Sequence, residues 1–428
     1  MRYESTLLKK NRSDKSFTFR EACVAMVWIT AFYSSIIQQK IVAIPYAMLM
    51  LGVATLLIFM LSHIEHGFDI LSVFTDETSI LLFFMTYMLI IGSIFSLDLS
   101  AHISQWITCL EYMFLSIVIS SMIKESGTET YQVLLLIEAI ALAVVFLISP
   151  VYYGEQRYSI SLTMNPNGLG MGLAAGIWST LYHQQKKKVS LILSFLLIGL
   201  FLYCIFLTGS RKALIASAIN IVLWVAFCFF PSLKEQEQNS AFISAAIIVI
   251  LIVLAWRAFS VLYSGSMIAD RMGKLLYETT EGNRSDMYRA GFNMLKSNPL
   301  FGLGFQGFKH EYGSYSHATL VEIPVSSGII GSIIYFAVYF VSIRKTWRLY
   351  RLTKGISELA SEHAKIRMIM VLWAVMLFYT TCIIHQYQFD SFIIFGIIFG
   401  ETAYIENHLP ETISVPENKK VGCKYIKV

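Results

Sequence analysis

The stretch Val189–Thr208 reads VSLILSFLLIGLFLYCIFLT and contains no charged residue over its 20 positions. About 20 consecutive apolar residues are needed for a helix to cross the hydrocarbon core of a bilayer. The run is continuous, without the alternation of a barrel strand, and therefore predicts a transmembrane helix. Thr208–Ala213 then reads TGSRKA, and a second apolar run follows over 212–231. Together these segments predict a helical hairpin in the membrane.

The rest of the chain repeats this pattern. The 428 residues are 56% hydrophobic and 14% charged, with a mean hydropathy of +0.61. Soluble domains carry about 25% charged residues, so this composition excludes an ordinary soluble or disordered protein. We predict an all-α fold, a polytopic membrane helix bundle with about 12 transmembrane helices. The apolar runs lie at about 21–37, 41–62, 78–97, 103–123, 130–150, 166–182, 189–208, 212–231, 241–263, 319–343, 366–386 and 389–406.

Lysine and arginine placement orients the bundle, because cytoplasmic loops carry an excess of positive charge. With the N-terminus inside, 22 of the 33 Lys and Arg residues fall on the inner side. The net charge of +5 is therefore a topology signal, and no nucleic-acid partner is expected. The six cysteines stand singly, so neither a disulfide framework nor a zinc site is predicted. The expected parts are a cytoplasmic basic N-terminus (1–20), transmembrane helices 1–9 (21–263), an extracytoplasmic loop with short helices (264–318), transmembrane helices 10–12 (319–406) and a cytoplasmic tail (407–428).

The long outer loop is the main departure from a plain bundle, and loops of this length are usually functional. Asn283–Ser297 reads as a helix stopped by Pro299, with an apolar stripe suited to lying against the membrane domain. The following Gly302–Gly307 segment has the G-x-G-x-x-G spacing of a nucleotide fingerprint. It follows a helix stop instead of a strand, however, so tight turning of the backbone is the preferred interpretation.

Two side chains on the outer side point to chemistry. Arg211 is a positive residue on the predicted outer side, whereas Lys and Arg are usually in excess on the cytoplasmic side. Its guanidinium suits phosphate oxygens. The alternative is that it extends to lipid headgroups. His317, at the outer end of the tenth run, titrates near neutral pH and is a candidate acid or base. The alternative for His317 is an interfacial histidine that only meets water. Within the membrane, Glu111 and Glu138 are further functional candidates by default.

Four stretches taken together resemble the bacterial O-antigen ligase and polysaccharide polymerase family. They cover about 165 to 340, in the family's order and on one predicted face. Ala318 stands where asparagine is usual, and Tyr288 where tryptophan is common. The stretches are Asn165–Gly168 (NPNG), Thr208–Ala213 (TGSRKA), the run from Gly282 through the arginine helix to Gly304, and Ser316 through Glu322 to Gly331.

This resemblance implies a membrane glycosyltransferase acting outside the cytoplasm, in the bacterial cytoplasmic membrane. The donor would be a glycan on undecaprenyl diphosphate, and the reaction would be metal-independent and inverting, with no cofactor. The partners would be this lipid-linked oligosaccharide, an acceptor glycan and the lipid bilayer. The catalytic residues carried over are His317, Arg211 and Arg284. The substrate-binding residues carried over are Arg289, Tyr288, Glu322 and Asn165.

Several functions remain open on the sequence alone. A polymerase of repeat units is slightly favoured over a ligase that moves a finished glycan, because the two differ only in the acceptor. A transporter or lipid flippase using Glu111 and Glu138 is the alternative from another class. A non-catalytic scaffold or sensor that uses the outer loop is the third.

Overall fold

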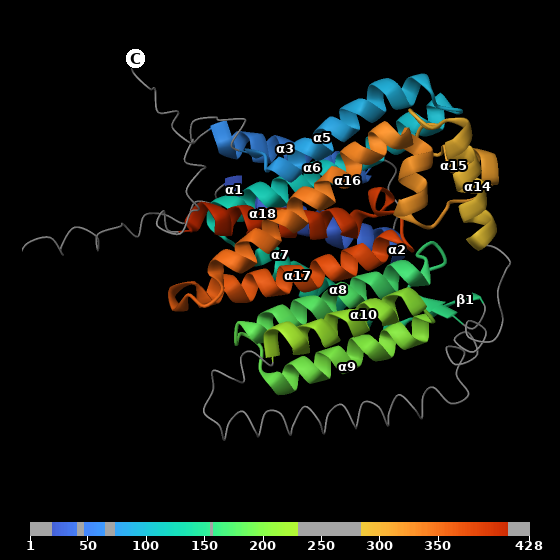
Figure 1. Cartoon of the computed structure of the whole chain (residues 1–428). Helices are drawn as coiled ribbons and strands as arrows, with labels where there is room; N and C mark the ends of the chain where they lie inside the picture. The colour runs from blue at the N-terminus through green and yellow to red at the C-terminus, as the bar shows by residue number, and fades with distance from the viewer. Residues whose placement is uncertain (1–18, 41–46, 65–72, 155–156, 230–283, 410–428) are drawn as a thin grey trace, which may run out of the picture.

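In a computed structural model, the chain is described over residues 19–40, 47–64, 73–154, 157–229 and 284–409. The predicted ninth run at 241–263, the loop as far as 283, and most of both termini lie outside these residues. The described part is a bundle of helices lying side by side, with one β-hairpin (Figure 1). Its elements are α1 (Phe19–Phe32), η1 (Tyr33–Ile37), α2 (Gln38–Lys40), α3 (Ala47–Ile64), α5 (Asp76–Tyr87), η2 (Met88–Gly92), α6 (Leu99–Ser126), α7 (Thr130–Ile148), β1 (Val151–Gly154), β2 (Arg157–Ser159), α8 (Pro166–Gln185), α9 (Leu191–Thr208), α10 (Arg211–Trp224), η3 (Val225–Phe229), α14 (Arg284–Ser297), α15 (Gly307–Tyr312), α16 (Thr319–Thr353), η4 (Ser357–Leu359), α17 (Ala360–Thr380), η5 (His385–Tyr387) and α18 (Phe389–His408).

The predicted all-α membrane bundle is confirmed. Every predicted run in the described residues falls on a helix, and seven helices there are long and apolar enough to cross a membrane. The total of about 12 spans stays a prediction. These seven candidates are Glu21–Lys40, Leu99–Ser126, Thr130–Ile148, Leu191–Thr208, Arg211–Phe229, Thr319–Thr353 and Ser357–Thr380.

The predicted α9–α10 hairpin forms as its residues dictate. The side chain of Ser190 accepts a hydrogen bond from the backbone N–H of Leu193 and caps the start of α9. Gly209 ends α9 in the left-handed conformation (φ 63°), which glycine adopts without steric cost. Ser210 then caps α10 by accepting from the N–H of Ala213. The basic pair in TGSRKA is therefore placed at the first turn of α10.

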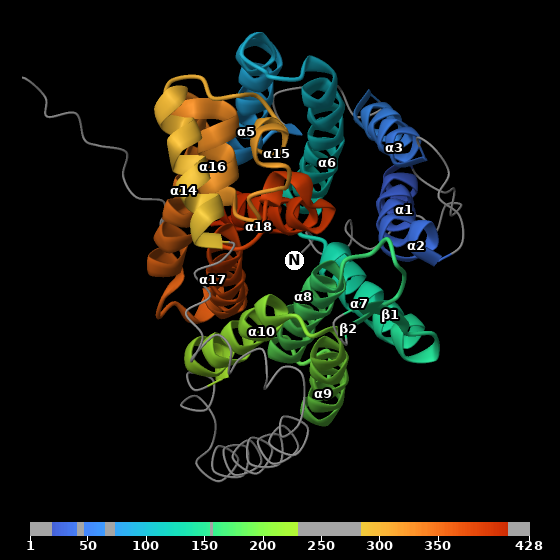
Figure 2. The ribbon, with the colours of Figure 1, turned by 90° about the vertical axis from the view of Figure 1, so that its right-hand side faces the viewer.

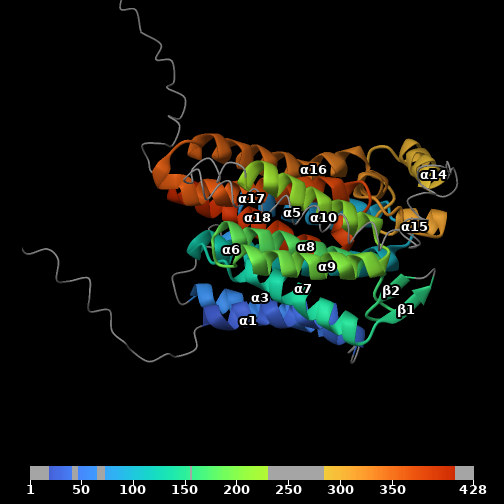
Figure 3. The same ribbon diagram turned by 90° about the horizontal axis from the view of Figure 1, so that it is seen from below.

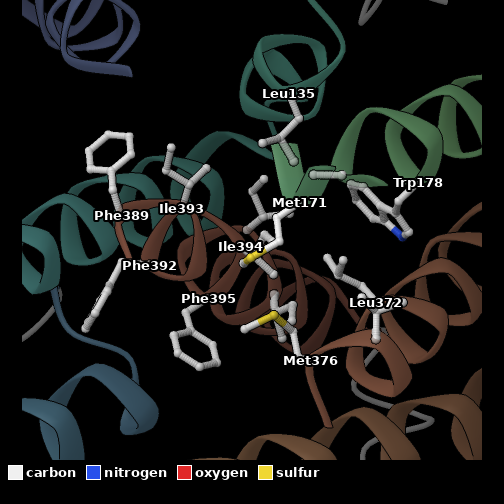
Figure 4. Packing of buried hydrophobic residues seen from close by; sticks show 14 of the residues in the cluster. Leu135, Met171, Trp178, Leu372, Met376, Phe389, Phe392, Ile393, Ile394 and Phe395 are labelled. Carbon is white, nitrogen blue, oxygen red and sulfur yellow. The ribbon is translucent and has the colours of Figure 1, made fainter. Parts of the chain in front are cut away.

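Small residues bring the central helices close together, which is how helices pack in a membrane environment. On α18, Gly396 and Gly400 lie against the backbone of α6, and a Cβ at Gly396 would come 3.0 Å from the Ser116 carbonyl oxygen. On α8, Gly176 lies directly against Ala139 of α7. Figure 4 shows the core that results, where side chains of α7, α8, α17 and α18 interlock.

Helix α16 is kinked at Gly328 (φ 65°, ψ −170°), and the loop before it fills the break. In a continuous helix the carbonyls of Val325 and Ser326 would accept from the N–H groups four residues later. Instead they accept from Leu303 N (2.8 Å) and Gly304 N (2.9 Å). In return, the N–H groups of residues 329 and 330 donate to the carbonyls of residues 299 (2.8 Å) and 300 (3.4 Å). The kink is therefore stabilised by four backbone hydrogen bonds to the loop.

Glycine is required on both sides of this junction. Gly302 has φ 74°, and a Cβ on it would lie 2.5 Å from the backbone nitrogen of Gly328. A Cβ on Gly328 would overlap the carbonyl of Leu300. Gly304 also has a positive φ, of 75°. The expectation that the glycines of the G-x-G-x-x-G segment allow tight turning is confirmed for Gly302 and Gly304.

The β-hairpin, α14 and α15 all lie at the same end of the bundle, which we call the loop end (Figures 1 and 3). The predicted helix over 283–297 is confirmed as α14, which begins at Arg284. Its apolar stripe packs as expected, since Met287 and Met294 join a cluster with Leu303 and Phe308. The loop therefore rests on the membrane bundle through α14 and the residues that follow it.

Charged groups at the opposite end of the bundle tie helices together. Glu401 of α18 is buried, with a side chain only 1% exposed. Its carboxylate accepts from Gln132 Nε2 (2.7 Å) and Tyr182 Oη (3.2 Å), and pairs with Lys365 (3.4 Å). A buried charge of this kind requires such partners, and three neighbouring helices supply them.

The lysine run 186–188 also has a partner at this end. Glu129 pairs with Lys186 and with Lys188, the latter at 2.7 Å. Burial alone raises the pKa of Glu129, but hydrogen bonds from the two ammonium groups and their positive charges outweigh it and lower the pKa. The carboxylate therefore stays ionised and links the α6–α7 connection to the α8–α9 connection.

The junction at the kink can be tested with Gly302→Ala, using Gly313→Ala as the control. Both glycines have positive φ, at 74° and 83°, so each alanine costs about 1–2 kcal/mol of backbone strain. Only at Gly302 would the new Cβ also strike the backbone of α16, whereas nothing lies within 4 Å of it at Gly313. Thermal unfolding of the purified protein in detergent should show the larger drop in midpoint for Gly302→Ala. Equal drops would contradict the proposed close approach.

Candidate functional site

A cavity of about 380 Å³ lies at the loop end. Figure 2 views the bundle from this end, with α14 in front of α16. The residues that line the cavity come from segments far apart in the sequence. They are Gln105, Thr108, Asn165, Asn167, Gly168, Met171, Lys212, Tyr315, His317, Cys382, Ile383, Ile384, Tyr387 and Gln388.

His317 lines this cavity and is held in an unusual backbone conformation. Its φ is 58°, which costs a residue with a Cβ about 1–2 kcal/mol. The residues on either side are buried, Ser316 and Ala318 each being 1% exposed. The surrounding structure thus maintains the strained turn, and such strain is often found at functional positions.

Glu322 lies behind the cavity wall and is not among the lining residues. Its side chain is 0% exposed and accepts from Ser316 Oγ at 2.6 Å and from Ser316 N at 3.3 Å. Tyr387 Oη donates to its other oxygen at 3.4 Å. The carboxylate therefore holds the residue before His317 and a tyrosine of the facing wall in fixed positions.

One wall of the cavity is the connection between α17 and α18, residues 381–388, which the sequence analysis did not identify. The apolar run predicted over about 366–386 falls on α17, but α17 ends at Thr380, so the last residues of the run belong to this connection. The connection is tied to the start of α16, since Thr319 N and Thr319 Oγ1 donate to the Ile383 carbonyl at 2.8 and 2.6 Å. The only sequence signal was the polar stretch 385–388, HQYQ, at the end of the run.

Asn165 also lines the cavity, as the N-cap of α8. Its side chain accepts from the N–H of Asn167 at 2.9 Å, and Pro166 occupies the first helical position. The side-chain oxygen of Asn167 accepts from Ser210 Oγ and from Arg157, both at 3.0 Å. Arg157 also donates to the carbonyl of Thr208 (3.0 Å). The NPNG and TGSRKA motifs are thus joined in one hydrogen-bonded cluster beside the cavity.

Gln306, the N-cap of α15, connects three lining residues. It has φ 65° and is the second non-glycine residue of the loop end in the left-handed region. Its side-chain amide donates to Gln105 Oε1 (2.6 Å) and Tyr315 Oη (3.0 Å), and its N–H donates to Tyr387 Oη (3.5 Å). The loop that precedes α16 is in this way fastened to the cavity wall.

The predicted arginines are placed differently from His317 and Asn165. Arg211 begins α10 and is half-buried, but the next residue, Lys212, is the one that lines the cavity. On α14, the side chain of Arg289 is 75% exposed and pairs with Asp286 at 3.6 Å. Tyr288 donates from its hydroxyl to the Thr381 carbonyl at 3.1 Å, which docks α14 on the α17–α18 connection. Arg284 is the first residue of α14, and its side chain lies outside the described part of the chain.

Glu111 and Glu138, the two carboxylates that a transporter would use, are not among the residues that line this cavity. Glu138 is buried, hydrogen-bonds Ser35 and lies near Asp390, which are partners the sequence did not identify. Glu111 packs against Gly52 of α3. Within the described ranges, no group of three or more His, Cys, Asp or Glu side chains is placed to hold a metal ion.

Comparison with known proteins agrees with the motifs. A family model described as O-antigen ligase matches residues 195–336, about a third of the chain. The match runs from α9 to the middle of α16 and so includes Arg211, Lys212, His317 and the Gly302–Gly328 junction. No curated protein matches this chain. The family match confirms the predicted resemblance: residues 195–336 of this multi-pass membrane protein match the O-antigen ligase family.

Proposed function

We propose that the protein transfers a glycan from undecaprenyl diphosphate to a sugar hydroxyl on the extracytoplasmic side of the bacterial cytoplasmic membrane. The observation that carries this proposal is the cavity at the loop end, because His317 and Asn165 line it together. Lys212 of the TGSRKA turn lines it as well. The family match supports the same class, a membrane function of the O-antigen ligase or polymerase type.

In this proposal His317 acts as the general base. An imidazole nitrogen takes the proton from the acceptor hydroxyl while that oxygen attacks the anomeric carbon of the donor sugar. The bond from the anomeric carbon to the phosphate oxygen breaks, and the electron pair leaves with the diphosphate. A direct displacement of this kind inverts the anomeric centre. It requires no electron transfer and no redox cofactor.

The leaving diphosphate gains negative charge in the transition state, so fixed positive groups near it accelerate the reaction. Arg211 at the start of α10 is the proposed clamp, with Arg284 and Arg289 of α14 supplying further guanidinium groups. Tyr288 holds α14, the helix that carries both arginines, against the α17–α18 connection. Glu322 is proposed to act through Ser316, which precedes the base, and is thus a positioning residue.

We infer that the acceptor is another lipid-linked repeat unit, which makes the protein a polymerase of surface polysaccharide. The test is an assay of the purified protein with undecaprenyl-diphosphate oligosaccharide, with and without a chelator. A ladder of longer products that is insensitive to the chelator is expected. A single addition to a separate acceptor would indicate a ligase, and absence of any product would reject glycan transfer.

His317→Asn tests the general base, because asparagine tolerates the left-handed backbone that this position requires. Loss of the base should lower kcat by about 10²–10⁴-fold, the usual contribution of a positioned acid or base. His310→Asn is the matched control, since His310 is an exposed histidine of α15 in the same loop. Comparable activity of the two variants in the product assay would reject the role of His317.

Glu322→Gln tests the positioning role. The glutamine keeps the size of the side chain but weakens its bonds to Ser316 and Tyr387, and bonds to a charged group contribute about 1.5–3 kcal/mol. We expect kcat to fall about tenfold or more while KM for the lipid-linked donor changes little. Glu311→Gln, on the exposed face of α15, should leave both constants unchanged. A raised KM with normal kcat for Glu322→Gln would instead indicate direct substrate binding.

A further inference from the structure

Lys212 is the cationic residue that the structure places in the cavity wall. It lies in the first turn of α10, and its ammonium group donates a hydrogen bond to the carbonyl of Cys382 in the α17–α18 connection. Cys382 lines the cavity as well. The side chain is therefore extended from α10 toward the opposite connection, and this bond fixes where the positive charge lies. An ammonium has three donors, so it can serve a carbonyl and a ligand together.

The electrostatic surroundings of the cavity favour an anion. Among the described residues that line it, none is Asp or Glu, and Lys212 is the one with a permanent positive charge. Three helices also begin at this cavity, as residues of the first turn or the N-cap of α8, α10 and α18 line it. A helix N-terminus carries a partial positive charge of about half an elementary charge. These contributions add to that of Lys212.

The remaining polar lining suits a sugar. Side-chain amides of Gln105, Asn167 and Gln388 line the cavity, together with the aromatic rings of Tyr315 and Tyr387. Amides donate and accept hydrogen bonds, as sugar hydroxyl groups require. The cavity thus combines one fixed cation with a neutral hydrogen-bonding wall, which matches a glycan that carries an anionic group.

We propose that Lys212 binds an anionic oxygen of the lipid-linked glycan inside this cavity. This inference rests on the proposed function and adds to it a substrate contact that the motifs assign only to the neighbouring arginine. The anion is either a phosphate oxygen of the carrier diphosphate or a carboxylate on one of the sugars. Lysine acts as a compact point charge and suits both, whereas arginine favours two-pronged contacts.

A purely structural role, in which Lys212 only tethers the α17–α18 connection, predicts different behaviour. Loss of a tether would lower the midpoint of thermal unfolding. Because the cavity wall would also be displaced, kcat per folded molecule would fall and KM would rise together. Loss of a substrate contact raises KM while the folded protein unfolds at the wild-type temperature. Lys40 is a matched control, because it lies at the same end of the bundle and donates to the Ser149 carbonyl at 3.0 Å without lining the cavity.

The experiment compares wild type, Lys212→Gln, Lys212→Arg and Lys40→Gln in the purified assay, with activities expressed per mole of folded protein. Two undecaprenyl-diphosphate oligosaccharides serve as donors, one with neutral sugars only and one containing a uronic acid. For Lys212→Gln we expect KM to rise about tenfold, as for loss of one hydrogen bond to a charged group. Lys212→Arg should recover part of this loss, and Lys40→Gln should match wild type.

A raised KM with both donors supports the proposal and identifies the diphosphate as the anion. A raised KM with the uronic acid donor alone supports it and identifies the sugar carboxylate. An unchanged KM with both donors would overturn the inference. A loss of activity in Lys212→Gln that is explained by a lower unfolding midpoint would overturn it as well. In both cases, turnover by the wild-type protein would still support the proposed function. Absence of turnover by wild-type protein with either donor would overturn the proposed function and this inference with it.

Discussion

The break in α16 at Gly328 is the constraint on which the loop end depends. A helix interrupted inside an apolar bundle leaves backbone groups unpaired, and each such group is costly away from water. Here residues 299–304 supply the missing partners through four backbone hydrogen bonds. These bonds can form only if the backbones of the loop and α16 come within hydrogen-bonding distance. Gly302 and Gly328 therefore face each other without side chains between them. The loop is consequently part of the bundle's own hydrogen bonding.

A short series of hydrogen bonds connects this junction to the cavity. Directly after Gly304, the N–H of Phe305 donates to His102 of α6 at 2.8 Å, and Gln306 then bonds three lining residues. From the other side, the first turns of α16 carry Glu322, which holds Ser316 beside His317. The kinked helix thus joins the loop and the proposed base. Two connections distant in sequence, 298–318 and 381–388, meet at its first residue.

Much of the architecture could be predicted because it depends on local patterns. Continuous apolar runs predicted the bundle, and the apolar stripe of Asn283–Ser297 with its stop at Pro299 predicted α14. The order of short motifs predicted the family resemblance that the comparison confirms. The errors arose where tertiary contacts override composition. Local patterns did not reveal the buried partners of Glu401, which come from three other helices. They also did not reveal the end of α17, which lies within an apolar run that continues beyond Thr380.

The amino-acid sequence by itself determined that this chain is a helical membrane protein, where its glycines permit tight turns, and which family it resembles. These properties follow from hydrophobicity and backbone freedom, which each residue carries with it. Only the tertiary structure decided which side chains share a cavity. It brought Lys212 and His317 to the wall of one cavity, left Arg289 exposed, and buried Glu322. The physical reason is that side-chain direction at a helix start depends on the helix's rotation and its neighbours, which no short stretch of sequence specifies.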